Sequence, residues 1–326
     1  MCTAISWKAG NHYFGRNLDL EGSYGEHIAV VPRRMPLKFH SGEALDVHYA
    51  LIGTAHIAGN YPLFYDAINE FGLCIAGLNF PGNAHYTGGD GAIACYEIAL
   101  RLLSACKTAQ EAVDMLLEKG ISGAAFHESM PATPLHFMIA DGKDCFVAEP
   151  MTDGIHIHEN SIGILTNNPP FEFQLANLNN YLNLTPKEAE IRFCENAPLQ
   201  AYSRGMGAIG LPGDFSSQSR FVRACFVKLN SPVQETAGSN IMQFFRMLDS
   251  VAMPMGSIIL ENGALDRTIY SSCCDAKKGI YYYKTYENSL IHAVDMHRED
   301  LDGQQLIRYP MISKCHICMQ NENPEA

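Results

Sequence analysis

The 326-residue chain has the composition of a globular protein, with 47% hydrophobic and 18% charged residues. Its formal net charge of −12 argues against nucleic-acid binding, which needs a basic face. Its apolar runs are too short or too charged to span a membrane. The amino terminus lacks the charged and apolar regions of a secretory signal, and eleven cysteines without regular spacing favour reduced thiols. A cytoplasmic protein is therefore expected.

The chain opens with a predicted β-hairpin. Residues 3–7 and 12–14 alternate like strands, and the residues between them, Lys8-Ala9-Gly10-Asn11, have turn chemistry. A pairing of Trp7 with His12 would set the register of the hairpin. This pairing brings the start of the first strand beside the end of the second.

In this register Cys2 lies opposite Asn17, and Thr3 lies opposite Arg16. Asp19 follows two residues later on the same strand, so Arg16 and Asp19 are both expected beside the amino terminus. The hairpin therefore places two charged side chains next to a cysteine that directly follows the initiator methionine.

The remaining elements are predicted to alternate between groups of strands and groups of helices. Expected strands lie at residues 28–31, 49–53, 73–78, 135–140, 145–149, 154–158, 162–166, 267–272, 279–285 and 290–295, the four from 135 to 166 forming an antiparallel meander. Expected helices lie at residues 93–106, 108–120, 173–182, 221–229 and 241–251, the second begun by a capping box of Thr108 and Glu111. Because no repeat or linker is visible, the chain is predicted to be a single α+β domain, residues 1–326, with antiparallel sheets and outer helices.

Cys2 is a candidate nucleophile. Removal of Met1 would leave this residue with both a thiol and an α-amino group, whose ordinary pKa of about 7.7–8.0 suits it to accept the thiol proton. Arg16 would favour the thiolate, and Asp19 could hold the amine by hydrogen bonds. The alternative is a chance cysteine beside a surface ion pair.

Three further polar residues lie where a fold can present them to a site. Asn79 and Asn167 each come at the end of a predicted strand, and Arg220 lies in the first turn of a helix capped by Ser216 or Ser217. An asparagine at a strand end can donate a hydrogen bond to a developing oxyanion. The alternative for both asparagines is an ordinary turn before proline.

Several motifs in one order resemble the choloylglycine hydrolase family of amino-terminal nucleophile hydrolases, and most of all the bile salt hydrolases of intestinal Gram-positive bacteria. The motifs are Met1-Cys-Thr-Ala4, Tyr13-Phe-Gly-Arg-Asn-Leu-Asp19, Gly77-Leu-Asn-Phe-Pro81, Leu165-Thr-Asn-Asn-Pro169, Gly210-Leu-Pro-Gly-Asp214, Ser219-Arg-Phe221, Gly279-Ile-Tyr-Tyr-Tyr283 and Thr285-Tyr-Glu-Asn288. They cover nearly the whole chain.

The resemblance implies a four-layer αββα sandwich and a cysteine amidohydrolase that cleaves taurine- or glycine-conjugated bile acids through an acyl thioester. It implies that Cys2 is the nucleophile, Arg16 lies close to the thiol, Asp19 anchors the amine and Asn79 contributes to the oxyanion hole. Asn167 and Arg220 are similar to the remaining polar residues of the family's active site. It also implies that no cofactor or metal is needed, that bile acids can be transferred to other amines, and that the enzyme is a homotetramer.

Substrate contacts are also implied by the resemblance. Relatives line the steroid pocket with apolar positions that match Leu20, Tyr65, Phe126, Met130 and Leu135, for which ordinary core packing is the alternative. Arg204 lies in a loop similar to the family's selectivity loop, where a guanidinium suits the sulfonate of taurine.

Two alternative functions stay open at this point. Penicillin V acylase is the same chemistry on another acyl group, but relatives with that preference often carry tyrosine at the position of Asn79. A zinc or redox module is suggested by Cys315-His-Ile-Cys318, with Cys273 and Cys274 as further thiolates, although one Cys-x-x-Cys is a weak signal.

Overall fold

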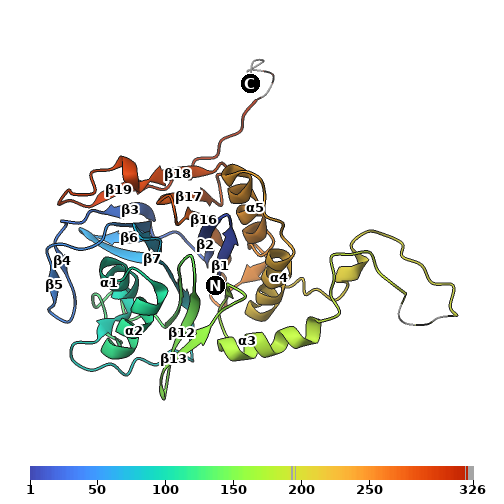
Figure 1. Ribbon diagram of the computed structural model, residues 1–326, viewed down its shortest axis with the longest axis horizontal. Helices are drawn as coiled ribbons and strands as arrows, with labels where there is room; N and C mark the ends of the chain where they lie inside the picture. Colours follow the sequence, from blue (N-terminus) through green and yellow to red (C-terminus); the bar gives the residue numbers. More distant parts are fainter. Residues whose placement is uncertain (192–193, 195, 320, 322–326) are drawn as a thin grey trace.

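Two antiparallel β-sheets lie face to face, and helices cover the outer face of each (Figure 1). The structure is a computed structural model and describes residues 1–191, 194, 196–319 and 321. The layers follow the order helix, sheet, sheet, helix, which confirms the predicted αββα sandwich. The amino terminus lies in the middle of these layers, at the start of β1.

The first sheet contains the opening hairpin. Its strand order is β14-β1-β2-β16-β17-β18, and β15 pairs with β16 at one side. The strands are β1 Cys2–Ala9, β2 Asn11–Leu20, β14 Ile164–Leu165, β15 Ile258–Ile259, β16 Leu265–Asp275, β17 Ile280–Thr285 and β18 His292–Asp295. β1 and β2 therefore lie near the centre of this sheet.

The second sheet has the order β13-β12-β11-β8-β7-β6-β3-β19. Its strands are β3 His27–Val31, β6 Leu51–Ala58, β7 Tyr61–Asn69, β8 Cys74–Asn79, β11 Leu135–Ala140, β12 Cys145–Met151, β13 Gly154–Glu159 and β19 Ile307–Pro310. Two short pairs lie outside the large sheets, formed by β4 Leu37–Lys38 with β5 Ala44–Leu45 and by β9 Ile93–Ala94 with β10 Ile121–Ser122.

The helices divide between the two outer layers. α1 Ile98–Ala105 and α2 Ala109–Lys119 bury their apolar faces on the second sheet, and α4 Ser217–Leu229 and α5 Ala237–Asp249 bury theirs on the first. α3 Phe171–Leu178 and the short 3₁₀ turns η1 Cys95–Glu97, η2 Asn179–Tyr181, η3 Met206–Ala208 and η4 Met296–Arg298 complete the set. No helix in the described part of the chain is long and apolar enough to cross a membrane.

The register of the opening hairpin differs by one residue from the sequence-based prediction. Cys2 pairs with Leu18 and Ala4 with Arg16, because Gly10 alone, at a φ of 74°, connects Ala9 to Asn11. Side chains alternate along a strand, so a slip of one residue moves every side chain to the other face. The observed register puts Cys2 and Arg16 on the same face, whereas the predicted one would have separated them.

Other elements also differ from prediction: β4, β5, β15 and β19 were not predicted, and the helix expected at 173–182 is α3. The strand expected at 162–166 is shorter and pairs with β1 in the first sheet, so it is not part of the meander. The helix expected at 93–106 begins only at Ile98. The sequence analysis missed most of β7. The predicted cap at Thr108 was correct: the backbone N–H of Glu111 donates to the Thr108 hydroxyl over 3.2 Å. The Glu111 carboxylate, however, accepts from the N–H of Lys107 rather than from that of Thr108, so the capping box is not complete.

Candidate active site

Cys2 is held by its backbone at the start of β1, and its side chain is 3% exposed. Its N–H donates to Oδ1 of Asn167 over 2.8 Å, and its carbonyl accepts from Nη1 of Arg220 at 2.5 Å. Both partners come from other parts of the chain, after β14 and from the first turn of α4. The first residue of the hairpin is therefore fixed on both sides of its Cα.

Asn167 connects three of the predicted site residues. Its Oδ1 accepts from Cys2 and from Nη2 of Arg220 at 2.8 Å, and its Nδ2 donates to the carbonyl oxygen of Asn79 over 2.7 Å. Its own backbone N–H donates to the hydroxyl of Ser217 over 2.8 Å. The side-chain amide of Asn167 therefore positions Cys2, Arg220 and Asn79 relative to one another.

Arg220 lies fully buried beneath the amino terminus. Besides Cys2 and Asn167, it donates to the hydroxyl of Thr3 at 2.6 Å and from Nε to the carbonyl of Phe215 at 3.0 Å. Burial lowers the pKa of Arg220, and the negative charge of Asp19 opposes that effect. This arginine therefore works as a rigid, multidentate clamp on the start of β1.

Arg16 spans the gap between the two sheets. Its Nη1 donates to the carbonyl oxygens of Tyr65 on β7 at 3.0 Å and Gly77 on β8 at 2.5 Å. Its Nη2 is buried and has no hydrogen-bond partner among the described residues. Although burial lowers the pKa of Arg16, the Cys2 thiol and other nearby groups raise it on balance, so a thiolate at Cys2 would meet a fixed positive charge.

Met1 precedes Cys2 in this structure and extends the ladder of the hairpin by one residue. Its ammonium group donates to the backbone oxygen of Asp19 and lies 3.7 Å from Oδ2 of Asp266, and the N–H of Asp19 donates back to the Met1 carbonyl over 2.9 Å. The nitrogen of Cys2 is therefore an amide here and cannot accept a proton.

The Asp19 carboxylate lies fully buried on the helix-facing side of β2. Its Oδ1 accepts from the hydroxyl of Thr268 at 2.6 Å, while its Oδ2 has no partner in the described part of the chain. Burial raises the pKa of Asp19, and the positive charges of Arg220 and the Met1 amine counteract it. One carboxylate oxygen is thus left without a donor close to the amino terminus.

The expected substrate contacts are distributed around this centre. Leu135 pairs with Asn79 across β11 and β8, and Tyr65 contributes the carbonyl that Arg16 binds. Leu20 ends β2 and is half-buried on the face that carries Cys2 and Arg16. Asn79 itself is exposed at the end of β8.

Phe126 and Met130 belong to the segment between β10 and β11. The ring of Phe126 packs against Tyr61 and Tyr96, with centroid separations of 5.6 and 5.2 Å. Met130 is half-buried in a tight loop closed by the backbone of His127. Both positions lie in a loop, which is a common place for substrate contacts.

Arg204 is not brought to the other site residues. It is exposed on an arm that leaves the end of η2 and returns at η3, and this arm extends away from the sandwich in Figure 1. The N–H of Thr185 donates to the carbonyl of Gly207 over 3.0 Å and closes the base of the arm. Within one chain, Arg204 therefore lies outside the site.

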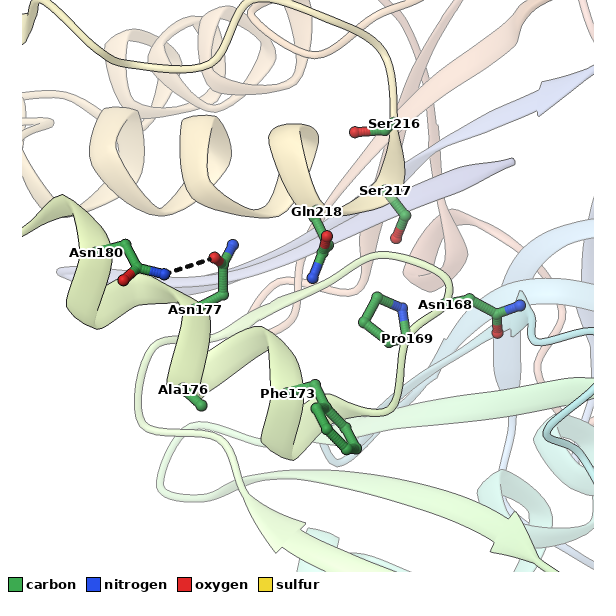
Figure 2. A pocket seen from close by; sticks show the side chains of 9 residues that line it. All are labelled: Asn168, Pro169, Phe173, Ala176, Asn177, Asn180, Ser216, Ser217 and Gln218. Carbon is green, nitrogen blue, oxygen red and sulfur yellow. Dashed lines mark hydrogen bonds between the residues drawn. The ribbon is translucent and has the colours of Figure 1, made fainter.

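A surface hollow of about 780 Å³ lies beside the site, between α3 and the first turn of α4 (Figure 2). It is lined by Asn168, Pro169, Phe173, Ala176, Asn177, Asn180, Ser216, Ser217 and Gln218. Ser217 is the residue that holds the backbone of Asn167, but the lining contains none of the residues expected to contact substrate. The hollow therefore lies behind the strand-end asparagine, away from Cys2.

The cysteines proposed as zinc ligands do not form a cluster. Cys273 and Cys274 are buried in β16, whereas Cys315 and Cys318 are exposed in the C-terminal segment. In the residues that the structure describes, no group of three or more His, Cys, Asp or Glu side chains is placed to hold a metal ion. The geometry gives no support to the four-thiolate hypothesis.

Sequence reasoning missed several partners of the site. These are Thr3, Asp66, Ser217, Asp266 and Thr268. Asp266 and Thr268 occupy alternate positions on β16, so extending the predicted strand, 267–272, by one residue toward the amino terminus would have indicated a shared face. Ser217 is predicted only as a possible helix cap, whereas the structure has Ser216 as the cap and Ser217 bound to Asn167. No local signal marks Asp66, because it acts through partners distant in sequence.

Comparisons with known proteins identify the family of the chain. The chain matches the family model of linear amide C–N hydrolases, choloylglycine hydrolase family, over residues 2–309. It is 46% identical over 324 residues to a bile salt hydrolase/transferase from Lactiplantibacillus plantarum, covering 98% of this chain and 100% of that protein. A bile salt hydrolase/transferase from Clostridium perfringens is 37% identical over 318 residues, which cover 95% and 96% of the two chains.

Solved structures show the same relationship. A crystal structure of a mutant conjugated bile acid hydrolase from Clostridium perfringens matches with a TM-score of 0.91 and 35% identity, covering 98% of this chain and 99% of that one. Penicillin V acylase from Agrobacterium tumefaciens shares the fold, with a TM-score of 0.77 at 21% identity over 98% and 96% of the chains. The chain belongs to the choloylglycine hydrolase family of linear amide C–N hydrolases.

Proposed function

We propose that this protein is a bile salt hydrolase that cleaves the amide between a bile acid and taurine or glycine. The carrying observation is the fixation of Cys2 by Asn167 and Arg220, on the same sheet face as the buried guanidinium of Arg16. Relatives named for bile salt hydrolysis align with the chain over nearly its full length and supply the substrate class.

The proposed reaction begins with loss of Met1, which converts the Cys2 nitrogen into an α-amine. This amine takes the thiol proton, with Arg16 favouring the thiolate, and Asp19 holds the resulting ammonium through its unpartnered oxygen. The thiolate attacks the amide carbon, and the oxyanion accepts hydrogen bonds from donors that include the Asn79 side chain.

The tetrahedral intermediate then collapses to products. The ammonium of Cys2 gives its proton to the departing amine of taurine or glycine, the C–N bond breaks, and an acyl thioester forms. Water, deprotonated by the same amine, attacks the thioester and releases the bile acid. An amine that replaces water in this step would yield a new amide, so transfer of bile acids to other amino acids is part of the proposal.

A substrate panel tests this function. Purified enzyme lacking Met1 is expected to hydrolyse taurocholate and glycocholate faster than penicillin V, and Cys2→Ser is expected to lower both activities by at least about 10³-fold. Faster turnover of penicillin V would assign the chain to acylases with that preference. Full activity in Cys2→Ser would refute cysteine catalysis altogether.

The arm that carries Arg204 supports two finer proposals, a homotetramer and a preference for taurine conjugates. It exposes large apolar side chains, including Leu182 at 82% and Tyr202 at 83%, which is unusual for a surface that faces only water. Light scattering is expected to give a tetramer. If Arg204 contacts the sulfonate across a subunit interface, Arg204→Ala should lower kcat/KM for taurocholate more than for glycocholate.

We also propose that residues 1–326 form one domain that works in the cytoplasm. All eleven cysteines are unpaired, which fits a reducing compartment. A single cooperative thermal transition is expected, whereas two separate transitions would contradict the single domain.

A further inference from the structure

A buried acidic network lies between the two sheets, next to Arg16. Asp66 on β7 is 0% exposed and accepts three hydroxyl donors: Tyr270 at 2.6 Å, Tyr281 at 2.5 Å and Ser272 at 2.9 Å. These donors come from β16 and β17 of the opposite sheet. Asp66 thus reaches from the second sheet to the first, in the direction opposite to Arg16.

Two β-bulges create this crossing. On β7, Asp66 pairs with Thr54 but Phe64 pairs with Ala55, so Tyr65 is the extra residue, and its carbonyl accepts from Arg16. On β16, Ile269 is the extra residue between Thr268 and Tyr270. The second bulge lets one strand present Thr268 to Asp19 on the helix-facing side and Tyr270 to Asp66 on the inner side.

The hydrogen bonds suit an ionised Asp66. Three hydroxyl groups are placed to donate to its two oxygens, and an ionised carboxylate offers only acceptors. Burial raises the pKa of Asp66, and the Arg16 guanidinium is the main opposing charge. The positive charge of Arg16 therefore favours the ionised form of Asp66 against the effect of burial.

We propose that Asp66 is a positioning residue for hydrolysis, which holds Arg16 in the orientation that leaves Nη2 available at Cys2. Nη1 of Arg16 is occupied by the carbonyls of Gly77 and of Tyr65, the residue before Asp66. The backbone N–H of Arg16 donates to the hydroxyl of Ser272 over 3.1 Å, and this hydroxyl donates to Asp66, whose charge acts on the guanidinium through space. The three hydroxyl donors fix Asp66 in turn. This assignment rests on the proposed function, because it concerns the activation of the same nucleophile.

The groups that surround the pair come from several elements. Cys2 of β1, Asp19 of β2 and Tyr270 of β16 act on Arg16 together with Asp66. The thiols of Cys74 on β8 and Cys274 on β16 also face Asp66. If the charge of Asp66 acts on Cys2 only through space, its removal therefore shifts the pH dependence of the Cys2 reaction in one predictable direction.

The direction of this shift separates the two explanations. Neutralising Asp66 removes a negative charge, so a purely electrostatic effect would shift the pH profile of Cys2 alkylation to lower pH. If Asp66 instead positions Arg16, the guanidinium moves, and the profile shifts to higher pH by about one unit. The measurement is the rate of Cys2 alkylation by iodoacetamide against pH, resolved by peptide mass spectrometry.

Asp66→Asn is expected to lower kcat for taurocholate by about 10²-fold per titrated Cys2, with KM changed less than about threefold. Tyr270→Phe removes one of the three hydroxyl donors and keeps the Asp66 carboxylate. It is expected to lower kcat by about tenfold. This variant tests the same role if Asp66→Asn does not fold. In an enzyme that already carries Arg16→Gln, Asp66→Asn is expected to lower kcat further by less than about twofold.

Asp141→Asn is the matched control. Asp141 is also a nearly buried carboxylate, but it accepts only backbone N–H groups, from Ala109, Lys143 and Asp144, and it touches neither arginine nor Cys2. Its kcat should stay within about twofold of wild type.

Two results would overturn the role of Asp66. One is a double variant in which the losses of kcat from Arg16→Gln and Asp66→Asn multiply; the other is an Asp66→Asn enzyme with normal kcat whose Cys2 alkylation profile is shifted to lower pH. Absence of bile salt hydrolysis by wild type would instead refute the proposed function, and the alkylation profile would still report on Asp66.

Discussion

Replacing Arg220 with methionine tests the clamp on the amino terminus most directly. The guanidinium donates to four acceptors: the carbonyls of Cys2 and Phe215, the hydroxyl of Thr3 and Oδ1 of Asn167. Methionine fills similar space but leaves these four acceptors without their donor, and it removes the positive charge that counteracts the burial of Asp19. Loss of one partner from a buried charged network costs about 3–5 kcal/mol.

This free energy converts into a measurable shift of the melting temperature. For 326 residues the entropy of unfolding is about 0.7 kcal/mol per kelvin, so a loss of about 4 kcal/mol lowers Tm by roughly 6 °C. The activity per titrated Cys2 should fall by about 10²-fold, because the nucleophile is no longer fixed. Differential scanning calorimetry and taurocholate hydrolysis measure the two effects.

Arg223→Met is the control on the same helix. Arg223 is half-buried and donates to the carbonyls of Ser250, Pro212 and Asp214, with no contact to Cys2. Its loss should cost about 1–2 kcal/mol and leave the activity per titrated Cys2 unchanged. If the two variants melt within 1 °C of each other, or if Arg220→Met keeps full activity, the assignment of the clamp is wrong.

Three further predictions concern the nucleophile, the hairpin and the pH dependence of stability. The exposed cysteines, Cys194, Cys315 and Cys318, are first replaced by serine. In this variant iodoacetamide should label Cys2 before the other cysteines when Met1 has been removed, and far more slowly when Met1 is retained. Peptide mapping measures the labelling. Gly15→Ala should destabilise the protein by about 1–3 kcal/mol in urea titrations, because a Cβ at this position would overlap the carbonyl oxygen of Ser272, whereas Gly22→Ala meets open space and should be neutral. Hydrogen bonds from His136 and His158 lower the pKa of Glu149 from 4.5 to about 2 despite its burial, so Glu149 contributes stability that is present above about pH 4.5 and is lost, by about 3 kcal/mol in total, as the pH falls toward 2. Glu149→Gln should flatten that part of the stability curve, and an unchanged slope would contradict the assignment.

The sequence predicted the local elements well where hydrophobic periodicity and capping chemistry were clear. The strand at 135–140 and the helix after Thr108 match the structure. Most of β7 was missed because residues 61–65, Tyr-Pro-Leu-Phe-Tyr, contain a proline and no alternation of apolar and polar residues, and because the bulge at Tyr65 breaks the period of the strand. Pairings between distant strands, such as β1 with β14, leave no local pattern.

The sequence predicted that several of the site residues lie together, but it did not predict their geometry. Family motifs brought Cys2, Asn167 and Arg220 together correctly, and the structure joins all three by hydrogen bonds. The hairpin register was wrong by one residue, because a turn made by Gly10 alone cannot be distinguished in sequence from a four-residue turn. Partners such as Asp66 could not be predicted, since they depend on which faces of the two sheets meet.

The ladder that joins Met1 to Asp19 makes the order of events during synthesis important. Once β1 and β2 have paired, the first peptide bond forms part of a sheet and its amine is tied to Asp19 and Asp266. An aminopeptidase needs an extended, unpaired terminus, so trimming has to precede closure of the hairpin on the growing chain. Synthesis that outruns the peptidase would therefore yield folded but inactive molecules, and the intact mass of a preparation would report its active fraction.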